Sequence, residues 1–141
     1  MDAADIIAQW KSNNSSIDWR PMTPAGKKQW LKACLFWSGL PNRTIPSFHY
    51  VIDGNQVTSD LDLYCLLGEV FFGYRGYFGQ GIDGFDDCFS EIYIYNPDGV
   101  AEDGATVVVE KALKLKSVLD EDYFQIIVDI FRKHGFHVIL D

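Results

Sequence analysis

Residues 106–109, with the sequence TVVV, decide the fold class of this chain. A strand that is apolar at every position is typical of the centre of a parallel sheet that is covered on at least one side. Further apolar runs lie at residues 48–52 and 136–140, and helical patterns separate them from the central run. Strands that alternate with helices in this way predict a βαβ arrangement and a parallel sheet.

The spacing of capping residues and apolar side chains predicts three helices in this part of the chain. They are expected to begin at Thr58 or Ser59, at about Ile82, and, behind the cap Asp120, at Glu121. A glycine-rich loop at residues 73–81 precedes the second helix, and Gly135 ends the third. The sequence NPDG at residues 96–99 predicts a turn before the central strand.

Residues 1–46 are predicted to form a helical N-terminal arm with a linker, ahead of an α/β domain at residues 47–141. Apolar spacing predicts a first helix over residues 5–11, and Thr23 with Pro24 is a favourable N-cap and N1 pair for a second helix. The tryptophans of this arm are interpreted as packing surface, either for the rest of the chain or for a second copy in a homodimer.

The composition excludes several classes of protein. Hydrophobic residues make up 48% of the 141 residues, which is typical of a globular domain and not of a disordered acidic tail. The N-terminus lacks a signal-peptide pattern and no apolar stretch is long enough to span a membrane, so we expect a cytoplasmic protein. Cys34, Cys65 and Cys88 lie far apart in apolar stretches, which favours buried reduced thiols over disulfides or a zinc site.

The net charge of −8 is distributed unevenly. Residues 1–46 carry +3 and the remainder carries −11, and residues 76–110 contain no lysine or arginine. Such a field repels nucleic acid, whose binding requires neutralised phosphates, and attracts basic proteins. A basic protein is therefore the expected partner, and direct binding of DNA or RNA is not expected.

Two faces separate along the predicted helix at residues 82–92. Four apolar residues recur at intervals of three and four and should face the core: Ile82, Phe85, Phe89 and Ile92. Asp83, Asp86 and Asp87 lie at i, i+3 and i+4 on the other side. Because no basic residue is near in sequence, we expect these three carboxylates to be unpaired and to share one exposed face.

Spacing alone leaves several interpretations of this carboxylate cluster open. A solvated face at a helix N-terminus is one of them. A divalent-metal site or a glycosidase pair fits less well, because neither a set of six oxygen ligands nor a desolvated acid is evident. We also find no nucleophile with a base and no phosphate loop, so neither an enzyme nor a cofactor is expected, and His49, His134 and His137 are interpreted as structural or solvated.

Five motifs give the chain a resemblance to a known family. They are YVIDGNQVTSDLDLYCLL (residues 50–67), GYFGQGIDGFDDCF (residues 76–89), TVVVEKALKLKSVL (residues 106–119), IFRKHG (residues 130–135) and HVILD (residues 137–141). In this respect the chain resembles the barstar-like proteins, which inhibit small secreted ribonucleases. The second motif is the most specific, because residues 77–87 fit the family's most recognisable element position by position.

The resemblance implies a two-layer α/β fold with a small three-stranded parallel sheet, and an inhibitor that plugs a nuclease cleft with the acidic helix and the loop before it. It places Asp87 in the phosphate-binding pocket of the nuclease, gives Asp83 a second charged contact, and lets Tyr77 cover the entrance. The complete predicted partner-binding set is Tyr77, Gly79, Gln80, Asp83, Asp86, Asp87 and Ser90. The partner implied is a basic ribonuclease toxin, against which this chain is an immunity protein.

Four departures from the family pattern suggest a partner other than its best-known nuclease. Asp86 stands where the family often has a large aromatic residue, and the loop at residues 90–104 is longer than usual. The acid that the family carries late in its third helix matches Asp129 in one register and Lys133 in another. Residues 1–46 have no counterpart in short members, which leaves an interaction or regulatory module that self-associates through this arm as the alternative function.

Overall fold

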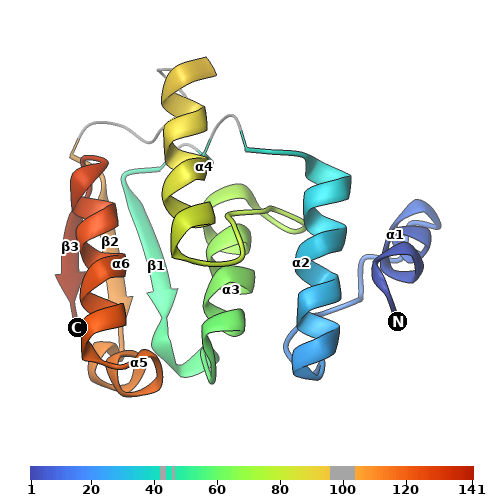
Figure 1. The fold of residues 1–141 in the computed structure, drawn as a ribbon, viewed down its shortest axis with the longest axis horizontal. Coiled ribbons are helices and arrows are strands. Elements are labelled where there is room, and N and C mark those ends of the chain that lie inside the picture. The colour runs from blue at the N-terminus through green and yellow to red at the C-terminus, as the bar shows by residue number, and fades with distance from the viewer. Residues whose placement is uncertain (42–43, 46, 96–103) are drawn as a thin grey trace.

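The computed structural model describes residues 1–41, 44–45, 47–95 and 104–141 (Figure 1). In chain order its elements are α1 (Ala3–Lys11), α2 (Pro24–Ser38), β1 (His49–Asp53), a short 3₁₀ helix (Gly54–Gln56), α3 (Asp60–Phe72), α4 (Ile82–Tyr95), β2 (Thr106–Glu110), α5 (Ala112–Leu119), α6 (Glu121–Lys133) and β3 (His137–Leu140). The chain is therefore a mixed α/β protein with a helical N-terminal extension, as predicted.

The three strands form one parallel sheet in the order β1-β2-β3, so the TVVV strand is central, as its sequence predicts. Val107 and Val109 of β2 are buried, while Val51 of β1 and Ile139 of β3 are 44% and 51% exposed. Side chains alternate between the two faces of a strand, so one face of the sheet is covered and the other is largely open. The helices that cover the buried face include α3 and α6 (Figure 1).

Side-chain caps begin the predicted helices as expected. The Ser59 and Asp120 side chains accept hydrogen bonds from the backbone N–H groups of Asp62 and Tyr123, at the first turns of α3 and α6. Thr23 does the same for α2 through the N–H of Gly26. Each bond satisfies a backbone donor that the helix itself leaves free.

Two elements differ from the prediction. Helix α5 was not predicted, because the alternating apolar and basic residues of its sequence do not show helical spacing at first sight, although Ala112, Leu115 and Leu119 are buried on one side of it. Helix α4 continues to Tyr95, so the segment predicted as a loop from Ser90 is helical over its first six residues. The turn predicted at residues 96–99 lies outside the described residues.

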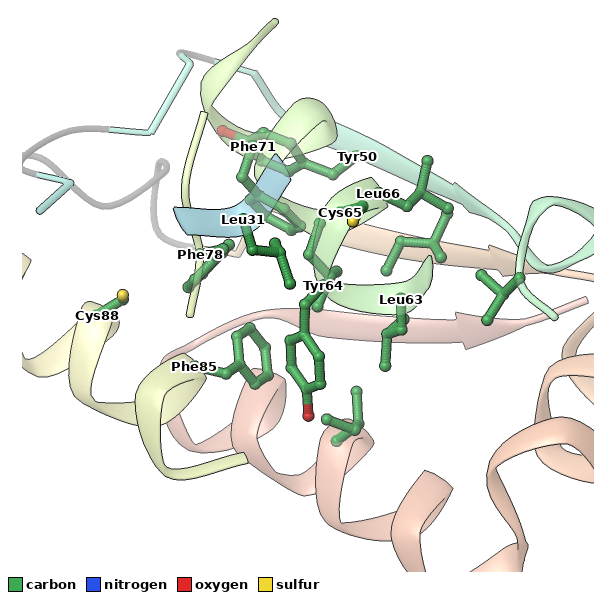
Figure 2. Close-up of a cluster of buried hydrophobic side chains, with 14 of the residues drawn as sticks. Leu31, Tyr50, Leu63, Tyr64, Cys65, Leu66, Phe71, Phe78, Phe85 and Cys88 are labelled. Atoms are coloured by element: carbon green, nitrogen blue, oxygen red, sulfur yellow. The ribbon is translucent and has the colours of Figure 1, made fainter. Parts of the chain in front are cut away.

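The N-terminal arm packs onto the rest of the chain. Helix α1 contacts α2, and α2 contacts α3 on the side away from the sheet (Figure 1). Trp10, Trp19 and Trp30 are at most 3% exposed, and Leu31 of α2 reaches the same hydrophobic cluster as Phe71 of α3 (Figure 2). Of the two alternatives for the arm, packing onto its own chain is therefore confirmed, whereas the domain boundary after residue 46 stays a prediction.

All three cysteines are buried free thiols, as expected. Burial raises the pKa of the Cys34 thiol to about 12 and also raises that of Cys65. No helix in the described ranges is both long and apolar enough to cross a lipid bilayer.

Candidate partner-binding site

The loop at residues 73–81 is held against the helices on either side of it by close glycine contacts. Gly79 has a φ of +91°, and a Cβ atom there would lie 2.5 Å from the backbone nitrogen of Phe85 in α4. A Cβ atom on Gly76 would collide with the backbone of Gly68 in α3. Because only glycine permits both approaches, the loop has a defined path from α3 to the first turn of α4.

The N-terminal arm contacts the start of this loop through hydrogen bonds and cation–π interactions. Trp10 Nε1 donates a hydrogen bond to Tyr74 Oη at 3.0 Å, and Ser38 Oγ donates one to the backbone oxygen of Arg75 at 2.6 Å. The Arg75 guanidinium lies 4.8 Å from the ring centroid of Trp37 and 5.5 Å from that of Trp10, within cation–π range. The arm therefore supports the segment that carries the predicted contact residues Tyr77, Gly79 and Gln80.

Tyr77 and Gln80 lie at the end of the loop next to α4. The ring of Tyr77 packs partly against the core, and burial raises the pKa of its hydroxyl in spite of a hydrogen bond with the Gln80 side chain. Gln80 itself is exposed. A shallow hollow lies beside Tyr77, between Phe72 and residues 38–41 at the end of the arm.

Helix α4 buries the apolar face that its sequence predicts. Phe85, Phe89 and Ile92 are completely buried, and Ile82 is partly buried against the same cluster. The Phe85 ring lies edge-on to that of Phe131 in α6, with centroids 5.1 Å apart. This packing turns the opposite side of α4 toward solvent.

The three aspartates of α4 do not share one environment, which corrects the prediction that all three are unpaired. Asp83 and Asp87 are exposed and form no ion pair with any residue in the described ranges. Asp86 accepts hydrogen bonds from Lys133 Nζ at 2.7 and 3.0 Å and lies 2.8 Å from His134 Nε2. The prediction failed because these partners lie 47 and 48 residues away in sequence.

The environment of Asp86 favours its ionised form. Hydrogen bonds from Lys133 and from His134 hold the pKa of this carboxyl below its ordinary value, although partial burial acts in the opposite direction. His134 is 8% exposed and its ring stacks on that of Phe89 at 4.4 Å, which agrees with a structural role. Of the two candidates for the family's late acid, Lys133 is engaged with Asp86, and Asp129 accepts a hydrogen bond from Gln125 Nε2 of its own helix at 2.9 Å.

Glu91, which is partly exposed, extends the acidic side of α4 and was not among the predicted site residues. Asp83, Asp87 and Glu91 follow one another at intervals of four residues, each step turning the side chain by about 40° around the helix axis. They form one stripe along α4, which we call the acidic stripe, with Ser90 exposed at its edge. The four-residue spacing was the available signal.

Two other kinds of chemistry were considered for the described residues of this site, a reactive thiol and a bound metal ion. Burial and the neighbouring Asp87 and Glu91 raise the pKa of the Cys88 thiol to about 12, so the reactive thiolate is suppressed. Within the described ranges, no group of three or more histidine, cysteine, aspartate or glutamate side chains converges to hold a metal ion.

The chain matches the model of a known protein family. A family model described as Barstar (barnase inhibitor) matches residues 48–137, well over half of the chain. This range contains the loop, α4 and the acidic stripe, together with the whole of α6. A search of curated proteins finds no significant match.

Proposed function

Since the chain belongs to the barstar family, we propose that it is an immunity protein that binds and blocks the active site of a cognate basic ribonuclease toxin. The inhibitory surface consists of the loop before α4 and the outer side of α4. Its members are Tyr77, Gly79, Gln80, Asp83, Asp87 and Ser90, with Asp86 at the margin toward α6. The protein acts without a cofactor, as an inhibitor and not as an enzyme.

The acidic stripe is the observation that carries this proposal. Asp83 and Asp87 are exposed on a helix whose other side is anchored in the core by Phe85 and Phe89, so the charges stand on a rigid support. No cation in the described part of the chain pairs with either of them. Exposed carboxylates without internal partners are available to a basic surface on another protein.

The chemistry of a ribonuclease explains why such a stripe inhibits it. The enzyme must hold arginine, lysine or histidine side chains where negative charge develops on the phosphoryl group. A carboxylate on α4 can accept charge-assisted hydrogen bonds from the same cations. We assign Asp87 to the phosphate-binding pocket and Asp83 to a second cation, with Tyr77 covering the entrance.

The electrostatic field of the whole domain supports fast capture of a basic enzyme. Residues 47–141 carry a net charge of −11, opposite in sign to the proposed partner. Opposite fields raise the association rate, which benefits a protein that must silence a toxin in the cytoplasm before RNA is cut.

The test is a titration of ribonuclease activity with the purified chain, using barnase and a panel of other small basic microbial ribonucleases. We expect equimolar inhibition of at least one enzyme. Asp87→Ala should weaken that inhibition about a hundredfold or more, and Asp83→Ala should weaken it less, because a desolvated charge pair is lost from the complex.

Glu110→Ala is the matched control, since it also removes one exposed negative charge, at the end of β2 away from α4 (Figure 1). It should inhibit like the wild type. Full inhibition by both Asp87→Ala and Asp83→Ala would contradict the assignment of the site, and failure to inhibit any ribonuclease would contradict the function.

One observation favours the alternative of a module that self-associates through residues 1–46. Phe36 and Leu40, at the end of α2 and just after it, are 64% and 57% exposed, and Trp37 between them is 39% exposed. Light scattering after size-exclusion chromatography decides this alternative. A dimer that Phe36→Ser with Leu40→Ser converts to a monomer would support it, whereas a wild-type monomer would exclude it.

A further inference from the structure

We propose that Asp86 is a positioning residue, which fixes the rotation of α4 on α6 through Lys133 and His134 and so aims the acidic stripe at the partner. The inference rests on the inhibitory function proposed above. It assigns Asp86 an indirect part in binding, in place of the direct contact that its position in the family motif suggests.

The carboxylate of Asp86 is already engaged within the chain. Lys133 Nζ lies 2.7 Å from Oδ2 and 3.0 Å from Oδ1, and His134 Nε2 lies 2.8 Å from Oδ1. The Asp86 side chain is only 29% exposed. A partner that bound this carboxylate would have to displace Lys133 or approach the few lone pairs that remain.

The direction of Asp86 differs from that of the acidic stripe. Around the helix axis, Asp86 lies about 60° from Asp83 on one side, while Asp87 lies about 40° from Asp83 on the other. Asp86 therefore points toward α6 and Asp87 points away from it. The edge of α4 that carries Asp86 is therefore paired with α6, while the edge that carries Asp87 exposes its charge to solvent.

The ion pair adds to the apolar contacts between α4 and α6. Phe85 and Phe89 pack on Phe131, with ring centroids 5.1 and 6.2 Å apart, on the core side of α4. The contact with Lys133 consists of charge-assisted hydrogen bonds at the edge of the interface, and these lengthen when α4 rolls so that Asp86 turns away from α6. The ion pair is therefore a second restraint on the rotation of α4, outside the core.

Lys133→Met separates a positioning role from a simple electrostatic one. Lys133 is 58% exposed and positive, so its removal should speed association with a basic ribonuclease if only the field matters. If the ion pair also positions α4, removal should in addition speed dissociation, by up to about fivefold, the most that an exposed ion pair commonly contributes. Lys133→Arg, which keeps the pair, should restore the wild-type rate.

Arg132→Met is the matched control, because Arg132 is exposed on the same helix and forms no ion pair within the described ranges. The probe is barnase or, where the wild type does not inhibit barnase, the ribonuclease of the panel that it does inhibit. We expect Arg132→Met to change the association rate alone. Asp86→Asn should add less to the dissociation rate in the Lys133→Met background than it does alone, since both changes break the same ion pair.

Hydrogen exchange of the free protein tests the same ion pair without any partner. Amides of α4 should exchange up to about fivefold faster in Lys133→Met than in Arg132→Met. Equal exchange and equal dissociation rates in these two variants would overturn the inference. If no ribonuclease is inhibited by the wild type, the proposed function fails, and the exchange rates alone decide whether Asp86 positions α4.

Discussion

Two of the ion pairs that join helices in the described part of the chain differ in burial. Lys27 of α2 lies 2.5 Å from Asp62 of α3, with side chains 11% and 2% exposed. Lys133 of α6 lies 2.7 Å from Asp86 of α4, with side chains 58% and 29% exposed. The first contact fastens the N-terminal arm to the fold, and the second fastens the acidic helix. Because the first contact is buried, breaking it should cost more free energy of unfolding than breaking the second.

The largest effect is expected when the buried contact is broken. Lys27→Met leaves the carboxylate of Asp62 in the interior without its cation, so we expect the free energy of unfolding to fall by about 3–5 kcal/mol. Urea denaturation measures this change. Lys28→Met is the matched control, because Lys28 is the exposed neighbour on the same helix and should have almost no effect.

A double variant distinguishes an unpaired charge from lost packing. In Lys27→Met with Asp62→Asn, the side chain at position 62 is neutral and can still accept the hydrogen bond that the Thr58 backbone N–H donates at 2.8 Å. Most of the lost stability should return. If the double variant were no more stable than Lys27→Met alone, the ion pair would not be the reason for the loss.

The half-exposed contact should contribute far less to stability. Asp86→Asn removes the charge but keeps a side chain that can hydrogen-bond, and exposed pairs commonly contribute about 0–1 kcal/mol. We expect a loss within that range in the same urea measurement. A loss as large as that of Lys27→Met would remove the distinction between the two contacts.

The smallest effect is the pH dependence of the Asp86 contribution. Lys133 and His134 lower the pKa of Asp86 in the folded state, so its stabilising effect is present above the unfolded value of about 4 and is lost as the pH falls through the folded value. The difference in unfolding free energy between wild type and Asp86→Asn should therefore shrink below about pH 4. Urea midpoints at pH 7, 4 and 3 measure it, and a difference that grew on acidification would contradict the lowered pKa.

Local patterns in the sequence were sufficient for most of the fold. The apolar run of β2 predicted a central parallel strand, and the spacing of Phe85 and Phe89 predicted the buried face of α4, because both depend on the period of a single element. Helix α5 was not predicted, because its alternating apolar and basic residues resemble the two-residue period of a strand.

The pairing of Asp86 could not be predicted, because it depends on how two distant helices meet. Helical spacing placed Asp83, Asp86 and Asp87 on one side of α4, but only the packing of α4 on α6 brings Lys133 and His134 to one of them. For the same reason, the sequence could not show whether the N-terminal arm packs on its own chain or on a second copy. Its tryptophans were evidently apolar packing surface, and only the tertiary structure shows that Trp10 and Trp30 face their own chain.

The contacts between the N-terminal arm and the loop also place three tryptophans near the partner-binding surface, where their spectra can report on binding. Trp10, Trp30 and Trp37 lie close together, with the Trp10 ring 5.2 Å from Trp30 and 5.7 Å from Trp37. The Arg75 guanidinium lies over the ring of Trp37, and Arg75 is only two residues before Tyr77 in the chain. A movement of the loop when a partner binds must disturb these indoles, so tryptophan fluorescence and near-ultraviolet circular dichroism should record events at the partner-binding surface without an attached label.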